Sequence, residues 1–190
     1  MSDHKPNPEY LRDLGENTTN VANAWAGARD YLSRGLKEWA KRQISGDRRL
    51  AVKAALAACS IVASQYPEQP EPGLPGRGYV DGMLAAIRRW LDDPSEKHSE
   101  LVRSSLNITR EAHAWQREED VAPFWILEAV DHASLSVWAG ERSSYIVPMD
   151  FATCASRAIA CVLHAMLDAG ESEAHAVDVV TTAVRSAVDR

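Results

Sequence analysis

The sequence predicts an all-α fold: a single-domain helical bundle of about seven helices with some non-parallel crossings. Three observations predict it. Apolar residues recur every three or four positions along most of the chain, which is the spacing of one helix face. Capping residues and glycines separate these apolar runs. No segment alternates apolar and polar residues in the manner of a half-buried strand.

Length and composition favour one compact domain. The chain has 190 residues, of which 45% are hydrophobic and 25% are charged, and these are ordinary values for a globular protein. Two separate domains would each bury a poor core at this length. We expect residues 1–16 to form a flexible N-terminal tail and residues 17–190 to form a single helical domain.

The first half of the domain is expected to hold two or three helices. The first apolar stripe consists of Val21, Trp25, Ala28, Leu32, Leu36 and Trp39. Glycine disfavours a helix interior, so residues 33–35 are a candidate break in this run. Ser45, Gly46 and Asp47 predict a helix end followed by a new N-cap. Residues 50–63 are apolar nearly all round, which predicts a helix at the centre of the bundle.

A long loop is expected at residues 67–78. The segment PEQPEPGLPGRG holds prolines and glycines that cannot continue a helix. We interpret it as an exposed, protease-sensitive connection within one domain.

The second half is expected to hold four or five helices. A helix carrying Val80 to Leu91 should end at Asp92. Asp93 then predicts an N-cap, with Pro94 at the first helical position and Glu96 closing a capping box. Three further helices are predicted at about residues 123–139, from Asp150 to Gly170, and from Ser172 to the end of the chain.

Cysteine usage and hydropathy predict a cytoplasmic protein. The chain has three cysteines, Cys59, Cys154 and Cys161, and no two of them form a CxxC motif. All three lie in apolar helical stretches, as reduced core thiols do. The first residues hold no apolar run for a secretory signal. The stretch at 50–63 is too short to cross a bilayer of roughly 30 Å, so no membrane span is expected.

The net charge of −6 disfavours nucleic acid as the main partner, because the field of the whole molecule repels phosphates. Short basic clusters occur at Lys37, Lys41, Arg42, Arg48 and Arg49. We interpret them as solvated helix faces.

No catalytic residue, metal ligand or cofactor is predicted. The sequence contains no Gly-rich phosphate loop, no GxSxG and no HExxH. Cys154, Cys161 and His164 share one helix face, a spacing compatible with soft metal ligands, but a fourth ligand is not identifiable and close helix packing explains the small residues. Glu128 and His132 stand four apart, which suits a surface ion pair, and a proton-transfer pair or a metal clip is the alternative.

Arg157 and His164 also share a helix face, about two turns apart. This spacing resembles the Arg-x(4–6)-His signature of the HEPN family of helical RNases. The resemblance implies metal-independent RNA cleavage at a dimer interface.

Tryptophans and carboxylates supply a candidate surface for a protein partner. Six tryptophans are many for a domain of this size, and Trp90, beside an apolar stripe, is the candidate anchor. Acidic residues are concentrated between 111 and 141, and an acidic surface suits a basic partner through steered association. The predicted partner-binding residues are Trp90, Glu118, Glu119, Asp120, Glu128 and Asp131.

Four short segments occur in a fixed order along the chain: DRRL at 47–50, AALAAC at 54–59, LAAIRRWL at 84–91 and EAVDHA at 128–133. Together they resemble a family of Ala-rich helical immunity proteins encoded beside bacterial polymorphic toxins, and the similarity spans about Asp47 to Met166. The resemblance implies a non-enzymatic inhibitor that binds its toxin in the cytoplasm.

Together these observations predict a non-enzymatic cytoplasmic protein-binding domain, an immunity-type inhibitor that occludes a toxin domain. Two alternatives stay open: a HEPN-like RNase that uses Arg157 and His164, and a structural assembly subunit. A second copy of the chain is a further candidate partner.

Overall fold

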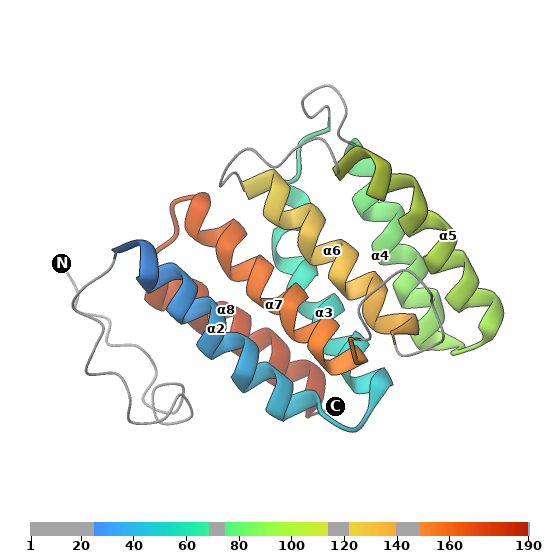
Figure 1. Cartoon of the computed structure of the whole chain (residues 1–190), viewed down its shortest axis with the longest axis horizontal. Helices are drawn as coiled ribbons and strands as arrows, with labels where there is room; N and C mark the ends of the chain where they lie inside the picture. The colour runs from blue at the N-terminus through green and yellow to red at the C-terminus, as the bar shows by residue number, and fades with distance from the viewer. Residues whose placement is uncertain (1–24, 69–74, 114–121, 140–148, 190) are drawn as a thin grey trace.

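The computed structural model describes residues 25–68, 75–113, 122–139 and 149–189, without the side chains of residues 25–31 and 106–113. Over these ranges the protein is an all-α bundle, and they contain no strand (Figure 1). The elements in chain order are α2 (Trp25–Ile44), α3 (Arg48–Val62), the short 3-10 helix η2 (Ala63–Gln65), α4 (Arg77–Asp92), α5 (Glu96–His113), α6 (Ala122–Trp138), α7 (Phe151–Asp168) and α8 (Glu173–Val188). The predicted all-α class is therefore confirmed.

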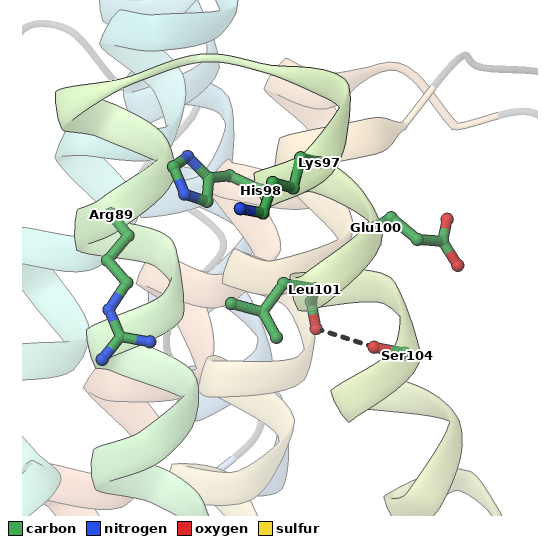
Figure 2. A pocket seen from close by; sticks show the side chains of 6 residues that line it. All are labelled: Arg89, Lys97, His98, Glu100, Leu101 and Ser104. Atoms are coloured by element: carbon green, nitrogen blue, oxygen red, sulfur yellow. Dashed lines mark hydrogen bonds between the residues drawn. The ribbon is translucent and has the colours of Figure 1, made fainter.

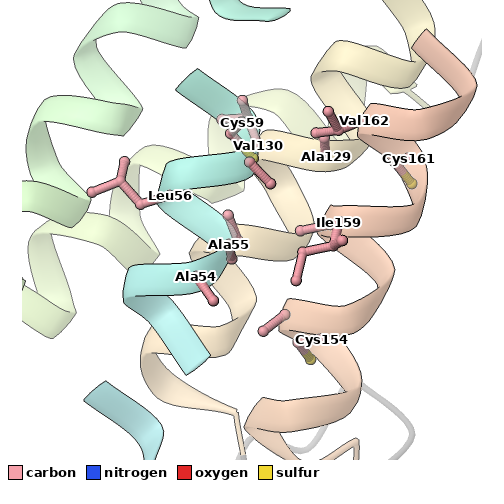
Figure 3. Packing of buried hydrophobic residues seen from close by; sticks show 14 of the residues in the cluster. Ala54, Ala55, Leu56, Cys59, Ala129, Val130, Cys154, Ile159, Cys161 and Val162 are labelled. Carbon is pink, nitrogen blue, oxygen red and sulfur yellow. The ribbon is translucent and has the colours of Figure 1, made fainter. Parts of the chain in front are cut away.

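Helix α3 lies at the centre, as its all-round apolar sequence predicts. It packs against α4, α6, α7 and α8. Its buried residues include Val52, Leu56, Cys59 and Val62. Figure 3 shows part of this core, where small side chains from α3, α6 and α7 let the three helices approach closely.

Local capping chemistry begins and ends several helices where the sequence predicts. Gly46 has a φ of 99°, and Asp47 then caps α3 by accepting a hydrogen bond of 3.2 Å from the Leu50 amide. Gly170 has a φ of 91° and ends α7. Ser172 caps α8 through the His175 amide.

Two predicted boundaries are wrong. Helix α2 runs without a break through residues 33–35, because packing of Leu36 and Trp39, both fully buried, outweighs the low helix propensity of Gly35. Asp93 is the C-cap of α4 rather than the N-cap of α5. Its carbonyl instead accepts hydrogen bonds from the Ser95 amide at 2.7 Å and from Nδ1 of His98 at 2.9 Å.

The ends of the predicted loop at 67–78 are tied together. The Tyr66 hydroxyl donates to the Pro75 carbonyl at 2.8 Å, and Nε of Arg77 donates to the Tyr66 carbonyl at 2.8 Å. Arg77 also pairs with Glu68 at 2.9 Å. Helix α4 begins at Arg77, so the connection is shorter than predicted by two residues, and residues 69–74 lie outside the described ranges.

Helix α7 is the one described helix that is long and apolar enough to span a membrane by length and composition. Most of it is buried against α2, α3, α6 and α8. Packing at the centre of the bundle accounts for its apolar character.

Candidate functional site

Helices α6 and α7 carry a polar and aromatic strip on one side of the bundle. The Trp125 ring, near the start of α6, stacks on the His164 ring, near the end of α7, with centroids 4.4 Å apart and an interplanar angle of 20°. This contact requires the two helices to run antiparallel, as Figure 1 shows. We call Trp125, Glu128, His132, Arg157 and His164 the α6–α7 strip.

The strip contains one histidine–carboxylate pair. Nε2 of His132 lies 3.6 Å from Oε2 of Glu128, one helix turn away, and the His132 side chain is only 16% exposed. The i, i+4 contact predicted from the sequence is therefore present, but it is half-buried rather than on the surface, and it is an ion pair only when the imidazole is protonated.

A second carboxylate is held beside the strip by tyrosine. The Tyr79 hydroxyl, on α4, donates a hydrogen bond of 3.0 Å to Oδ1 of Asp131 on α6. Burial and, to a smaller extent, the negative charge of Asp131 together raise the pKa of the nearby Tyr66 to about 12. Tyr79 was missed by the sequence analysis, because its contact joins residues 52 positions apart.

The cysteines lie in the core. Cys59, Cys154 and Cys161 are all buried free thiols. Burial raises the pKa of the Cys59 thiol to about 12 and that of Cys154 to about 11. Burial also raises the pKa of Cys161, with a smaller effect from Glu128. Within the described ranges, no three His, Cys, Asp or Glu side chains are placed to hold a metal ion. Figure 3 shows Cys154 and Cys161 on α7 among apolar side chains.

Trp90 does not form an exposed anchor. It is 5% exposed, and its indole Nε1 donates a hydrogen bond of 3.0 Å to Oγ of Ser99. Trp90 therefore lacks the exposure expected of an anchor, because Ser99 of α5 lies against its ring, and its role in partner binding stays a prediction. Of the other predicted partner-binding residues, Glu128 and Asp131 are half-buried on α6. Glu118, Glu119 and Asp120 lie outside the described residues.

Three of the predicted solvated basic residues contact other helices, the first being Lys41 on α2, whose Nζ donates to Oγ1 of Thr153 on α7 at 2.8 Å. Arg48 donates from Nη1 to the Val137 carbonyl at 3.2 Å and from Nη2 to the Ala139 carbonyl at 2.7 Å. Arg49 donates to the Leu91 carbonyl at 2.8 Å. Each arginine thus satisfies carbonyls at the C-terminal end of another helix.

Comparisons with known proteins find no matching family model, no matching curated protein and no matching solved structure. The class that the geometry defines is an all-α bundle with a polar and aromatic strip over α6 and α7.

Proposed function

We propose that this protein is a protein-binding module that uses the segment of α6 from Phe124 to Asp131 to hold a basic segment of a partner. One observation carries the proposal: two carboxylates, Glu128 and Asp131, stand half-buried beside the partly exposed aromatic rings of Phe124 and Trp125. Aromatic side chains supply contact area at interfaces, while carboxylates select lysine or arginine.

The carboxylates are oriented before any partner binds. Asp131 accepts from Tyr79 at 3.0 Å, and Glu128 lies 3.6 Å from His132. Groups already held in place lose less conformational entropy on binding, so they favour association more than mobile surface side chains. The Trp125 ring is likewise oriented by its stack on His164.

An immunity-type inhibitor is the specific form of this function that we favour. Such a protein covers a toxin domain, and a basic toxin surface suits two oriented carboxylates. The resemblance of residues 47–166 to Ala-rich helical immunity proteins and the net charge of −6 support the same class.

Affinity capture from the native host, followed by a growth assay, tests the proposal. Wild-type protein should capture a partner whose expression alone stops growth, and co-expression should restore growth. The double variant Glu128→Lys, Asp131→Lys should lose both effects. Glu38→Lys is the matched control, because Glu38 is exposed on α2. If the double variant protects as well as wild type, α6 does not carry the function.

RNA cleavage is a second candidate, favoured by the shared helix face of Arg157 and His164. Arg157 is exposed and could bind a phosphate, while His164 is half-buried. Against it, Trp125 covers one face of the His164 ring and the net charge repels RNA. Purified protein that cleaves RNA, with loss of cleavage in His164→Ala, would establish this function instead.

A further inference from the structure

Helices α4 and α5 lie at the opposite edge of the bundle from α2 (Figure 1). A shallow pocket lies between these two helices (Figure 2). Its volume is about 420 Å³. The lining residues are Arg89 from α4 and Lys97, His98, Glu100, Leu101 and Ser104 from α5. None of these residues belongs to the α6–α7 strip.

Two cations at this pocket have no polar partner among the described residues. Neither the Arg89 guanidinium nor the Lys97 ammonium forms a hydrogen bond or an ion pair with another residue of the described ranges. Neighbouring arginines do have partners: Arg49 donates to the Leu91 carbonyl, and Arg103 pairs with Glu100. The contrast marks Arg89 and Lys97 as charges available to a ligand.

The pocket also has an exposed apolar side chain. Leu101 is 39% exposed, and among the described residues it is the most exposed of the large hydrophobic side chains. Figure 2 shows Leu101 facing Arg89 across the pocket, with Lys97 and His98 at its upper end, while the Glu100 carboxylate points away. An apolar contact flanked by positive charge is complementary to an acidic and apolar pair of side chains.

The imidazole of His98 is fixed in a defined orientation. Its Nδ1 lies 2.9 Å from the Asp93 carbonyl oxygen, which can only accept a hydrogen bond. Nδ1 therefore carries a proton, and the ring is held as part of the pocket wall.

We propose that the α4–α5 pocket docks an acidic peptide segment of a partner protein, in which a carboxylate lies between Arg89 and Lys97 and the adjacent apolar side chain covers Leu101. This interaction is independent of the basic segment assigned to α6. The two surfaces would bind oppositely charged parts of a partner, so one can fail without the other.

Chemical-shift mapping by NMR on the full chain tests the docking site. The probe is the blocked peptide acetyl-Asp-Leu-Asp-Leu-amide, and its uncharged counterpart is acetyl-Asn-Leu-Asn-Leu-amide. The acidic peptide should shift the amide signals of Lys97, His98 and Leu101 and saturate at millimolar concentration. Binding should weaken as salt rises, because exposed charges are screened over about 10 Å at 0.1 M.

Variants locate the interaction. The double variant Arg89→Gln, Lys97→Gln should weaken binding of the acidic peptide by about three- to tenfold, since each exposed ion pair contributes up to roughly fivefold to the affinity. Leu101→Ser should also weaken binding of this peptide. Arg34→Gln is the matched control, because Arg34 is an exposed arginine on α2. Unchanged melting temperatures verify that the variants fold.

Three outcomes would overturn the proposal. They are equal binding of the two peptides, equal binding to wild type and to the double glutamine variant, and absence of shifts at α4 and α5. Hexanoate is tested in parallel. If this free carboxylate binds as tightly as the acidic peptide, the pocket takes a small molecule and the peptide proposal is wrong.

Discussion

Nη2 of Arg48, in the first turn of α3, lies 2.7 Å from the carbonyl oxygen of Ala139, which directly follows α6. The same guanidinium donates to the Val137 carbonyl and lies 5.7 Å from the centre of the Phe151 ring. One side chain therefore joins α3 to the end of α6 and the start of α7.

Replacing Arg48 should destabilise the protein. We expect Arg48→Ala to lower the free energy of unfolding by about 2 kcal/mol. The substitution removes a charged donor, so the carbonyls of Val137 and Ala139 at the buried end of α6 lose their hydrogen bonds to it. Arg49→Ala removes one hydrogen bond, to the Leu91 carbonyl, at an exposed position where water can replace the donor. It should therefore lower the free energy of unfolding by less than about 1 kcal/mol. Arg34→Ala should stay within about 0.5 kcal/mol. Urea unfolding of the three variants measures the order, and equal costs would contradict a capping role for Arg48.

Two glycines near α4 should respond in opposite directions to alanine. A Cβ at Gly76 would lie 2.8 Å from the Glu68 carbonyl oxygen, so Gly76→Ala forces apart the two ends of the loop. A Cβ at Gly82, in the middle of α4, would meet no atom within 4 Å. We expect Gly76→Ala to lower the melting temperature and Gly82→Ala to stabilise by up to about 1 kcal/mol through helix propensity. Stabilisation by both variants would show that the loop ends do not touch.

The buried thiols should be unreactive in the folded state. Burial holds the pKa of Cys59 near 12 and that of Cys154 near 11, so neither forms a thiolate near neutral pH. Iodoacetamide at pH 8 should modify them only after unfolding. Because the raised pKa values keep protons bound in the folded state, stability should fall as pH rises above about 8.5, where unfolded thiols ionise. Rapid alkylation of the native protein would exclude this placement.

Cys161→Ala should cost only about 1 kcal/mol, which is the loss expected for a small buried side chain. Added zinc should leave the melting temperature unchanged. Near-stoichiometric zinc in the purified protein, lost in a Cys154, Cys161 and His164 triple alanine variant, would replace core packing with a metal site as the explanation for these residues.

Asp150 should contribute to acid sensitivity. Burial acts to raise the pKa of its carboxyl, but hydrogen bonds from the Thr153 amide at 2.7 Å and the Thr153 hydroxyl at 3.0 Å, together with the charge of Lys41, outweigh burial and lower it. A lowered pKa adds stability that is present above about pH 4 and is lost as pH falls through the folded value. Asp150→Ala should therefore flatten the fall in stability below pH 4. Asp150→Asn, which keeps an N-cap without the charge, should flatten it with a smaller loss at pH 7. An unchanged acid profile in both variants would contradict this role.

The helices and most of their ends could be predicted from the order of residues along the chain. The spacing of apolar residues marked the helix faces, and Asp47, Gly46, Gly170 and Ser172 act on backbone groups only three or four residues away, so local order is enough to identify them. Which helix faces pack against each other could not be predicted in this way, because it depends on contacts between distant parts of the chain. The burial of Trp90 depends on α5, the stack of Trp125 on His164 depends on the antiparallel pairing of α6 with α7, and the carbonyls bound by Arg48 lie 89 and 91 residues away. The spacing of residues along one helix identifies an apolar or basic face. It does not identify the helix against which that face packs, because this depends on how the faces of several helices bury one another at the same time.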